Sequence, residues 1–402
     1  MLKKFLALNR SKQAEILLWG LMFGRILQIF LCSVWARFHI PDVFLFNDII
    51  IIVLMFMSIR EWKYRISTRN IIAVVGLVLF YFLSGMFYSD SAEYVRDHGE
   101  AFIRAVLYIF VGLAIDINKH KYWLHQLSRI ATVGFFLYIT FMSSLANNPV
   151  DLEEENMYLA YLALPTTLFV IWQLLENLNI IDLVLSMVGS FLILSMGSRG
   201  PFVCIVFFVA AYLLFFKKYK RNALSKFLIA AAAALLYLFA DSILLLLIGI
   251  VSRFGLNVRV LESLMAKNMF AAENSSGRDR IWTELIQAIM KDSTGFGYGL
   301  GGDERITSTG FEAHNVILAI LISFGLILGG IILFLFIRYI FRAIKHTENT
   351  NQRVFLLILF TVGFVKLLMS AIFIVDYYFF MLIGYSIALS NLKSGNLTNT
   401  NI

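Results

Sequence analysis

Long apolar runs separated by short polar loops limit what this chain can fold into more than any other feature. There are about twelve such runs, and most are near the roughly 20 residues that cross the hydrocarbon core of a bilayer as a helix. Inside a bilayer the backbone groups must bond to one another, and a helix achieves this within one segment. The sequence therefore predicts an all-α, polytopic transmembrane helix bundle. The expected spans are residues 15–35, 42–59, 70–88, 101–117, 126–146, 157–175, 181–196, 202–216, 224–241, 315–337, 354–370 and 375–389.

The composition agrees with a membrane protein and excludes an ordinary soluble domain. Hydrophobic residues make up 60% of the chain and charged residues 15%, whereas a soluble domain is nearer half apolar and a quarter charged. The net charge of +8 comes mostly from Lys and Arg in short loops, so it indicates orientation in the lipid bilayer and not binding of nucleic acid. Cys32 and Cys204 lie inside expected spans and are interpreted as small core residues, since no disulfide framework or zinc-ligand spacing is present.

The basic loops all fall on the same side of the expected bundle. They are the N-terminus and residues 60–69, 119–121, 217–221 and 338–353. The positive-inside rule places these loops, and with them both termini, in the cytoplasm. The polar loop 89–100, the acidic loop 147–156, Arg199 and the long segment 242–313 are then expected on the outside.

The one long extramembrane segment, residues 242–313, divides the chain into three parts. Residues 1–241 are expected to form spans one to nine, and residues 314–402 form spans ten to twelve with a cytoplasmic tail. Within the long segment, residues 277–290 have the pattern of a helix that Ser275 or Ser276 would cap. A loop is expected next, because glycine occupies positions 295, 297, 299, 301 and 302.

Three arginines are candidate anion ligands. Arg199 lies at an external corner between two expected spans, where it is either an interfacial side chain or a clamp for phosphate oxygens. Arg278 and Arg280 lie on different faces of one expected helix, so at most one of them can point into a given cavity. The alternative for each is a solvated basic face.

His314 and Asn315 stand where the chain enters the tenth expected span. His314 is either a packing residue or a general base, because its ordinary pKa near 6.5 leaves it mostly neutral outside the cell. Neighbouring arginines would lower that pKa further. Asn315 could orient the imidazole ring or cap the span.

Four charged residues lie inside expected spans: Arg25, Arg104, Lys366 and Asp376. Charges at such positions are functional hypotheses by default. Lys366 and Asp376, near the outer ends of adjacent spans, could also simply pair with each other. The acidic residues of the outer loops show no spacing that demands a metal ion.

Several of these motifs together resemble the O-antigen ligase and O-antigen polymerase superfamily of polytopic membrane glycosyltransferases. They are Ser275-Ser276-Gly277-Arg278 with Trp282 four positions later, the loop Gly295-Phe296-Gly297-Tyr298-Gly299, His314-Asn315 with Gly325 eleven positions after the histidine, and Ser198-Arg199-Gly200. The resemblance covers about residues 195–330, and the N-terminal half is similar only in hydropathy.

The resemblance implies a metal-independent, inverting glycosyltransferase without a cofactor. Its donor would be an oligosaccharide on polyprenyl diphosphate, its acceptor another glycan, and its partners a flippase that delivers the donor and a chain-length regulator. Arg199 and Arg278 would hold the diphosphate, with Arg280 and Asn315 as further substrate ligands, and His314 would activate the acceptor hydroxyl. The expected location is the bacterial cytoplasmic membrane, with the active site on its outer side.

Within the superfamily the polymerase that joins repeat units of capsule or O-antigen is favoured, and the ligase to lipid A-core is the alternative. A protein O-oligosaccharyltransferase is a third possibility. A transporter or lipid-glycan flippase is the rival from another class, although it should show two corresponding halves with broken helices near the midplane. An outer cavity where Arg199, Arg278 and His314 converge would favour the enzyme. A midplane cavity with Arg25, Lys366 and Asp376 would favour transport.

Overall fold

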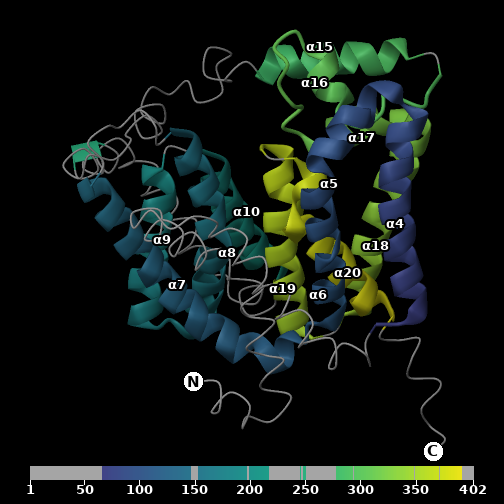
Figure 1. The fold of residues 1–402 in the computed structure, drawn as a ribbon. Helices are drawn as coiled ribbons and strands as arrows, with labels where there is room; N and C mark the ends of the chain where they lie inside the picture. The colour runs from purple at the N-terminus through teal and green to yellow at the C-terminus, as the bar shows by residue number, and fades with distance from the viewer. Residues whose placement is uncertain are drawn as a thin grey trace, which may run out of the picture. The chain divides into compact units, whose positions relative to one another are not determined.

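The computed structural model describes residues 66–145, 153–196, 199–216, 278–292, 294–347, 349–370 and 372–391, together with residues 245, 248 and 249. These residues form helices joined by turns, with no strand among them (Figure 1). Four of the described helical stretches are long and apolar enough to cross a membrane: Thr68–Phe87, Leu159–Asn177, Val316–His346 and Thr350–Leu368. The predicted all-α membrane class is confirmed for this part of the chain. The count of about twelve spans stays a prediction, since the expected spans 15–35, 42–59 and 224–241 lie outside the described residues.

The chain divides into two compact units. Residues 1–60 and 118–270 belong to the first unit, and residues 61–117 and 271–402 to the second. The described helices of the first unit are α7 (Ile117–Leu145), which begins at its boundary, α8 (Glu153–Asn177), α9 (Ile180–Ser195) and α10 (Arg199–Phe215).

Helix α7 begins earlier than the sequence predicts. Residues 119–121, expected in a cytoplasmic loop, instead lie in its first turns. There Lys121 forms an ion pair with Glu176 of α8, and its Nζ lies 4.6 Å from the centre of the Trp172 ring. These two partners allow Lys121 to lie in a helix. A prediction that assigns charged residues to loops does not take such partners into account.

Close contacts and a buried carboxylate join the helices of the first unit. A Cβ on Gly189 of α9 would lie 2.6 Å from the Thr167 hydroxyl of α8, so only glycine permits this approach. Asp182, fully buried near the start of α9, accepts a hydrogen bond from His125 at 3.0 Å and two from Arg129 at 2.8 and 2.7 Å. These bonds tie α7 to α9.

The second unit contains the expected tenth to twelfth spans and the helices packed around them. Its helices are α4 (Thr68–Phe87), α5 (Ala92–Val106), α6 (Tyr108–Ala114), α15 (Arg278–Lys291), α16 (Gly302–Ile306), α17 (Val316–Phe324), α18 (Gly330–His346), α19 (Thr350–Phe360) and α20 (Tyr377–Asn391). Short turns join them: η1 (Ser89–Ser91), the π-helical η4 (Gly325–Gly329) and η5 (Thr361–Val365), and the 3-10 turns η6 (Lys366–Leu368) and η7 (Phe373–Val375).

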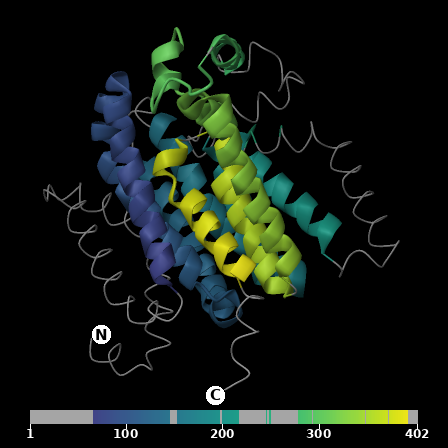
Figure 2. The same ribbon diagram turned by 90° about the vertical axis from the view of Figure 1, so that its right-hand side faces the viewer.

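Helix α20 is central to the second unit and packs against α6, α18 and α19. Figure 2 shows α18, α19 and α20 side by side. Where α6 and α20 cross, a Cβ on Gly112 would lie 2.2 Å from the Met381 carbonyl oxygen. A Cβ on Gly384 would lie 2.1 Å from the Ile109 carbonyl oxygen. Two glycines facing each other's helix therefore allow the two backbones to touch.

Residues 89–100 are mostly helical, although the sequence predicts a polar loop there. Helix α5 begins at Ala92, and Val95, Gly99 and Phe102 form its buried face. Glu93 and Asp97 are exposed on its other face. An amphipathic helix with this many charges has a low mean hydropathy, so a search for apolar runs misses it. The predicted span 101–117 is correspondingly replaced by the end of α5 and the short α6.

The last two expected spans, 354–370 and 375–389, are confirmed as helical segments. The first runs through Thr350–Leu368 with a π-helical turn in it, and the second is α20. Lys366 and Asp376, at the facing ends of these segments, form a buried ion pair. The pairing expected as the simpler alternative is therefore the one observed.

Candidate active site

Helix α15 lies across one end of the second unit, with α16 beside it (Figure 1). Ile281, Leu285 and Ile289 form its buried stripe at intervals of one turn. They pack with Ala313 and Ile322, the residues just before and within α17. The helix expected over residues 277–290 is confirmed, while its expected caps Ser275 and Ser276 lie outside the described residues. The stripe fixes α15 directly above the start of α17.

The glycine-rich segment after α15 is a loop, as predicted. Gly295, Gly297, Gly299 and Gly301 all have φ between 70° and 78°, the left-handed region that favours glycine. The amide of Tyr298 donates to the Ile322 carbonyl oxygen at 2.8 Å, and the amide of Gly299 donates to that of Ser323 at 3.0 Å. The loop therefore lies directly on the backbone at the end of α17.

The tenth span, expected over residues 315–337, lies within the helical stretch Val316–His346 and has a local break in its helical backbone at Gly325. Gly325 has φ 72° and ψ 176°, which is not helical. A Cβ there would lie 2.1 Å from the Gly295 carbonyl oxygen, and a Cβ on Gly297 would lie 2.3 Å from the Gly325 amide nitrogen. Glycine at position 325, eleven positions after His314, thus allows the backbone of the glycine loop to contact the end of α17.

His314 occupies the turn that leads into α17. Its φ is 46°, which is uncommon for a residue other than glycine. On one side, the Ala313 carbonyl oxygen accepts a hydrogen bond from Trp282 Nε1 at 2.9 Å, and the Ala313 amide donates to Asp303 Oδ2 at 2.8 Å. On the other side, Asn315 Oδ1 accepts from the amides of Ile317 at 3.0 Å and Leu318 at 3.3 Å.

Of the two readings of Asn315, the structure shows the cap. Its carboxamide oxygen satisfies the first amides of α17, which have no partner within the helix. This oxygen is therefore engaged in starting the span. The remaining role predicted for Asn315, as a substrate ligand, would fall to its amide nitrogen.

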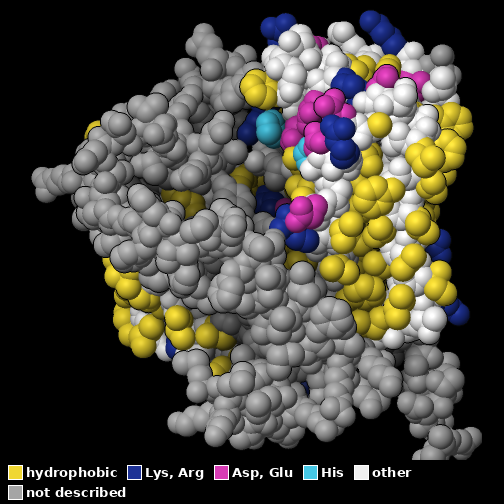
Figure 3. All heavy atoms as spheres, in the orientation of Figure 1, with side chains coloured by type: hydrophobic (Ala, Val, Ile, Leu, Met, Phe, Trp, Pro, Cys, Tyr) yellow, Lys and Arg dark blue, Asp and Glu magenta, His cyan; other side chains and the backbone are white. Residues whose placement is uncertain are grey.

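A small polar cavity opens beside His314. Its polar lining comes from Tyr94, Gly301, Asp303, Glu312, His314, Asn315 and Ser323. Leu300, Phe373 and Ile374 line this cavity and also a larger apolar cavity of about 340 Å³. The larger cavity is walled by side chains of α4, α5, α17, α18 and α20. On the surface drawn in Figure 3, charged side chains gather toward the upper end, and the surface beside and below them is mainly apolar.

The imidazole of His314 is held in its neutral form. Burial lowers its pKa, the positive charge of Arg278 lowers it further, and Asp303 partly opposes them. Its buried Nδ1 has no hydrogen-bond partner among the described residues. The lowering of the His314 pKa that was expected from a neighbouring arginine is therefore present. The ring can accept a proton at neutral pH.

Two acidic residues that the sequence analysis did not select, Asp303 and Glu312, line the His314 cavity, and Glu304 interacts with both of them. Burial raises the pKa of Asp303 and of Glu304. Burial and the charges of Asp303 and Glu304 raise the pKa of Glu312 to about 8. Asp303 and Glu304 follow the glycine loop, and Glu312 stands two positions before the histidine. These sequence positions, close to the glycine loop and to His314, were the only sign in the sequence that the acidic residues could matter. The structure is needed to show that Asp303 and Glu312 line one cavity with His314.

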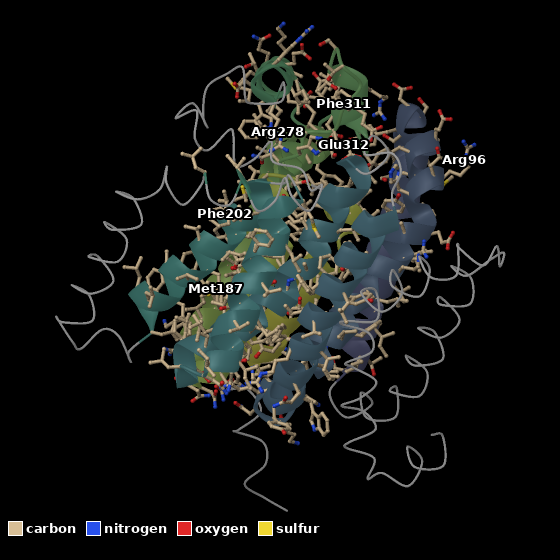
Figure 4. All side chains as sticks on the ribbon, turned by 90° about the vertical axis from the view of Figure 1, so that its left-hand side faces the viewer. Arg96, Met187, Phe202, Arg278, Phe311 and Glu312 are labelled. Atoms are coloured by element: carbon tan, nitrogen blue, oxygen red, sulfur yellow. The ribbon has the colours of Figure 1, made fainter. Side chains whose placement is uncertain are left out.

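The predicted arginines differ in their surroundings. Arg278 is half-buried at the first residue of α15 and is close enough to act on His314; Figure 4 shows it at the same end of the second unit as Glu312. Arg280 is 67% exposed and its Nε donates to Glu284 at 3.0 Å. Arg199 is the first residue of α10 in the other unit, and its side chain lies outside the described set. Its approach to His314 stays a prediction.

Arg305 is a further residue that the sequence reading missed. Its guanidinium donates to the carbonyl oxygens of Tyr298 at 2.6 Å and Leu300 at 3.0 Å. It also donates to the Asp90 carbonyl oxygen at 2.9 Å and to Ser91 Oγ at 3.3 Å. Arg305 thus holds the glycine loop against the turn that precedes α5. Asp90 and Ser91 are more than 200 positions away in the chain, so no local pattern could reveal these two partners.

The other charged residues of the expected spans that the structure describes, Arg104, Lys366 and Asp376, do not line the two cavities. Lys366 and Asp376 pair with each other and line neither of the two cavities. Arg104 Nη2 lies 3.5 Å from Glu100 on the exposed side of α5. Arg25 lies outside the described residues.

Residues 183–335 match the family model described as O-Antigen ligase. No match was found among the curated proteins or the solved structures. The matched segment contains Arg199, α15, the glycine loop, His314 and Gly325. Taken with the apolar helices, this match supports a relation of residues 183–335 to the O-antigen ligase and O-antigen polymerase superfamily of integral membrane proteins.

Proposed function

We propose that this protein transfers a glycan from a polyprenyl diphosphate donor to a hydroxyl group of an acceptor sugar at the outer face of the bacterial cytoplasmic membrane. The observation that carries the proposal is the setting of His314. A proton-accepting imidazole lines a small cavity, the charge of Arg278 acts on that imidazole, and the cavity borders a large apolar one. The imidazole can accept the proton of a hydroxyl group, the guanidinium of Arg278 can bind a diphosphate, and the apolar cavity can take part of a lipid chain.

In the proposed reaction His314 takes the proton of the acceptor hydroxyl as its oxygen attacks the anomeric carbon of the donor sugar. The bond from that carbon to the diphosphate oxygen breaks in the same step, so the anomeric configuration inverts and polyprenyl diphosphate leaves. A base positioned in this way contributes typically about 10²–10⁴-fold to a rate. His314 is suited to the role because Arg278 and burial keep it unprotonated.

Arg278 is proposed to hold the diphosphate. A guanidinium forms two parallel hydrogen bonds to phosphate oxygens and stabilises the charge that develops on the leaving group. Arg199 is proposed as the second guanidinium, in keeping with its place at the start of α10 within the matched segment. In this scheme fixed guanidinium groups, and no metal ion or cofactor, balance the diphosphate charge.

The apolar cavity is proposed to take the part of the polyprenyl chain nearest the diphosphate. Its lining includes Phe80, Phe102, Phe336 and Phe379, and its wall continues into the His314 cavity through Leu300. An isoprenoid chain gains free energy when such side chains remove it from water. A transporter is less well supported, because Lys366 and Asp376 are engaged with each other and line neither cavity.

The test is a transfer assay with the purified full-length protein and a polyprenyl diphosphate-linked oligosaccharide. A polymerase, the member we favour, extends the donor into a ladder of repeat units without another acceptor. A ligase forms product only when lipid A-core is added. Loss of donor from one leaflet of a proteoliposome, without any new glycosidic bond, would instead identify a flippase and contradict the proposal.

A further inference from the structure

Resting on the transfer reaction proposed above, we propose that Trp282 and Asp303 are positioning residues, which hold the His314 imidazole in its reactive orientation by clamping the peptide groups of Ala313. Neither side chain needs to touch the substrate for this role. Both act through the backbone that carries the base.

The backbone at His314 requires such support. Its φ of 46° is in the left-handed region, where a side chain with a Cβ is strained. A residue stays in such a conformation only when its surroundings determine it from more than one side. A small relaxation of φ would swing the imidazole away from the cavity that it lines.

Ala313, the residue before His314, supports this conformation from one side. Ala313 is only 1% exposed, and both of its backbone polar groups are taken by side chains. Its carbonyl oxygen accepts from Trp282 Nε1 at 2.9 Å and its amide donates to Asp303 Oδ2 at 2.8 Å. Asn315, which caps α17, anchors the chain on the other side of His314. The strained residue therefore lies between two fixed peptides.

The two clamping residues come from the two elements that shape the rest of the site. Trp282 follows Arg278 by four positions, one turn along α15, so the helix that presents the arginine also fixes the histidine. Asp303 is the second residue of α16, directly after the glycine-rich segment, and is 7% exposed. The helix that carries Arg278 and the turn that follows the glycine loop thus each supply one hydrogen bond to the residue before His314.

Two pairs of variants distinguish the loss of the hydrogen bonds to Ala313 from the loss of side-chain volume at Trp282 and of charge at Asp303. Trp282→Phe keeps an aromatic ring in the α15 core but removes the N–H donor. Asp303→Ala removes the acceptor, whereas Asp303→Asn keeps an acceptor oxygen without the charge. Trp123→Phe, the same aromatic exchange at a partly exposed position of α7, is the matched control.

The experiment measures kcat, the donor KM and the pH profile of each full-length variant in the transfer assay. A misplaced catalytic group can cost about 100-fold, so we expect Trp282→Phe and Asp303→Ala to lower kcat about 10- to 100-fold with the donor KM nearly unchanged. Asp303→Asn should recover most of the rate lost in Asp303→Ala, with the acid limb of its profile at lower pH. A kcat for Trp282→Phe equal to that of Trp123→Phe, or a rise in donor KM alone, would overturn the clamp.

A second measurement does not depend on transfer. Diethyl pyrocarbonate acylates neutral imidazole, and mass spectrometry reports the labelling rate of His314 itself. Loosening the clamp should change that rate several-fold in Trp282→Phe and Asp303→Ala, with no change in Trp123→Phe. Unchanged labelling in both clamp variants contradicts the inference, whatever the activity. An altered rate in a protein that shows no transfer supports the clamp and counts against the proposed function alone.

Discussion

His314 combines three unusual properties: a positive φ, a buried Nδ1 without a hydrogen-bond partner among the described residues, and a lowered pKa. Each of these costs the folded protein free energy, since strain, lost hydrogen bonding and desolvation are all unfavourable. Such costs are typical of residues kept for their chemistry. A histidine needed only for packing would avoid them by adopting a helical φ and bonding its second nitrogen.

The two arginines of α15 provide a matched pair of substitutions. Lysine keeps the charge but lacks the forked geometry that binds two phosphate oxygens. Arg278→Lys should therefore lower kcat/KM by about tenfold or more, in line with the roughly 1.4 kcal/mol that one decade represents. Arg280 is exposed and bonded to Glu284, so Arg280→Lys should stay within a few-fold of wild type. Equal losses in the transfer assay, with equal expression, would show that the arginine near His314 is not the diphosphate ligand.

Glu312 makes the stability of the protein depend on pH. Its pKa rises from 4.5 to about 8 on folding, so between these pH values the folded protein keeps a proton that the unfolded chain releases. Stability then falls as pH rises from 4.5 to 8. Glu312→Gln carries no proton to lose and should melt a few degrees above wild type at pH 8, with little difference at pH 5. Parallel melting curves for the two proteins across this range would contradict the raised pKa.

At the scale of elements, hydropathy and periodicity predicted the helices that stand alone in the sequence. The apolar span Thr68–Phe87 and the amphipathic α15 were found because each carries its own signal. Helix α5 was missed because charged residues dilute its buried stripe. The break at Gly325 was also missed, since it depends on contact with the glycine loop, which lies about thirty positions earlier in the chain. A single glycine in an apolar run predicts no such contact.

The contact between the glycine loop and α17 can be tested with two glycines of similar backbone conformation. Gly297 and Gly310 have φ of 78° and 68°, so alanine is strained by a similar amount at both. A Cβ at Gly297 would also lie 2.3 Å from a backbone nitrogen, whereas a Cβ at Gly310 meets nothing within 4 Å. Gly297→Ala should melt clearly below Gly310→Ala, which should lose only about 1 kcal/mol. Equal melting temperatures would mean that the loop does not lie on α17 so closely.

For the whole molecule, the membrane class follows from composition, and part of the site follows from motif spacing. Arg278 and His314 were selected from the sequence, and the structure places them close together. Asp303 and Glu312 were not selected because their significance lies in burial, and Arg305 was not selected because two of its partners come from a distant segment. Arg199 belongs to the other unit, so its part in the site rests on the motif and the family match.

The orientation of the chain in the membrane can be tested from the two ends of one helical segment, Val316–His346. Basic residues gather in its last turns, which predicts that this end faces the cytoplasm and that the His314 end faces outward. With Cys32 and Cys204 replaced by serine, Thr309→Cys should react with an impermeant thiol reagent in intact cells. Lys345→Cys should react only after the cells are opened. The opposite pattern would place the site in the cytoplasm, where an outer-leaflet donor could not reach it.

The central claim is that His314 is the base of a glycosyl transfer whose donor is held by other residues. Its most direct test is the His314→Ala variant, with donor binding and turnover measured separately on purified protein and a polyprenyl diphosphate-linked oligosaccharide. We expect turnover to fall by about 10²–10⁴-fold, while the donor dissociation constant stays within a few-fold of wild type because Arg278 remains. Turnover close to wild type would remove His314 from the mechanism, and loss of donor binding together with turnover would make it a donor-site residue instead of the base.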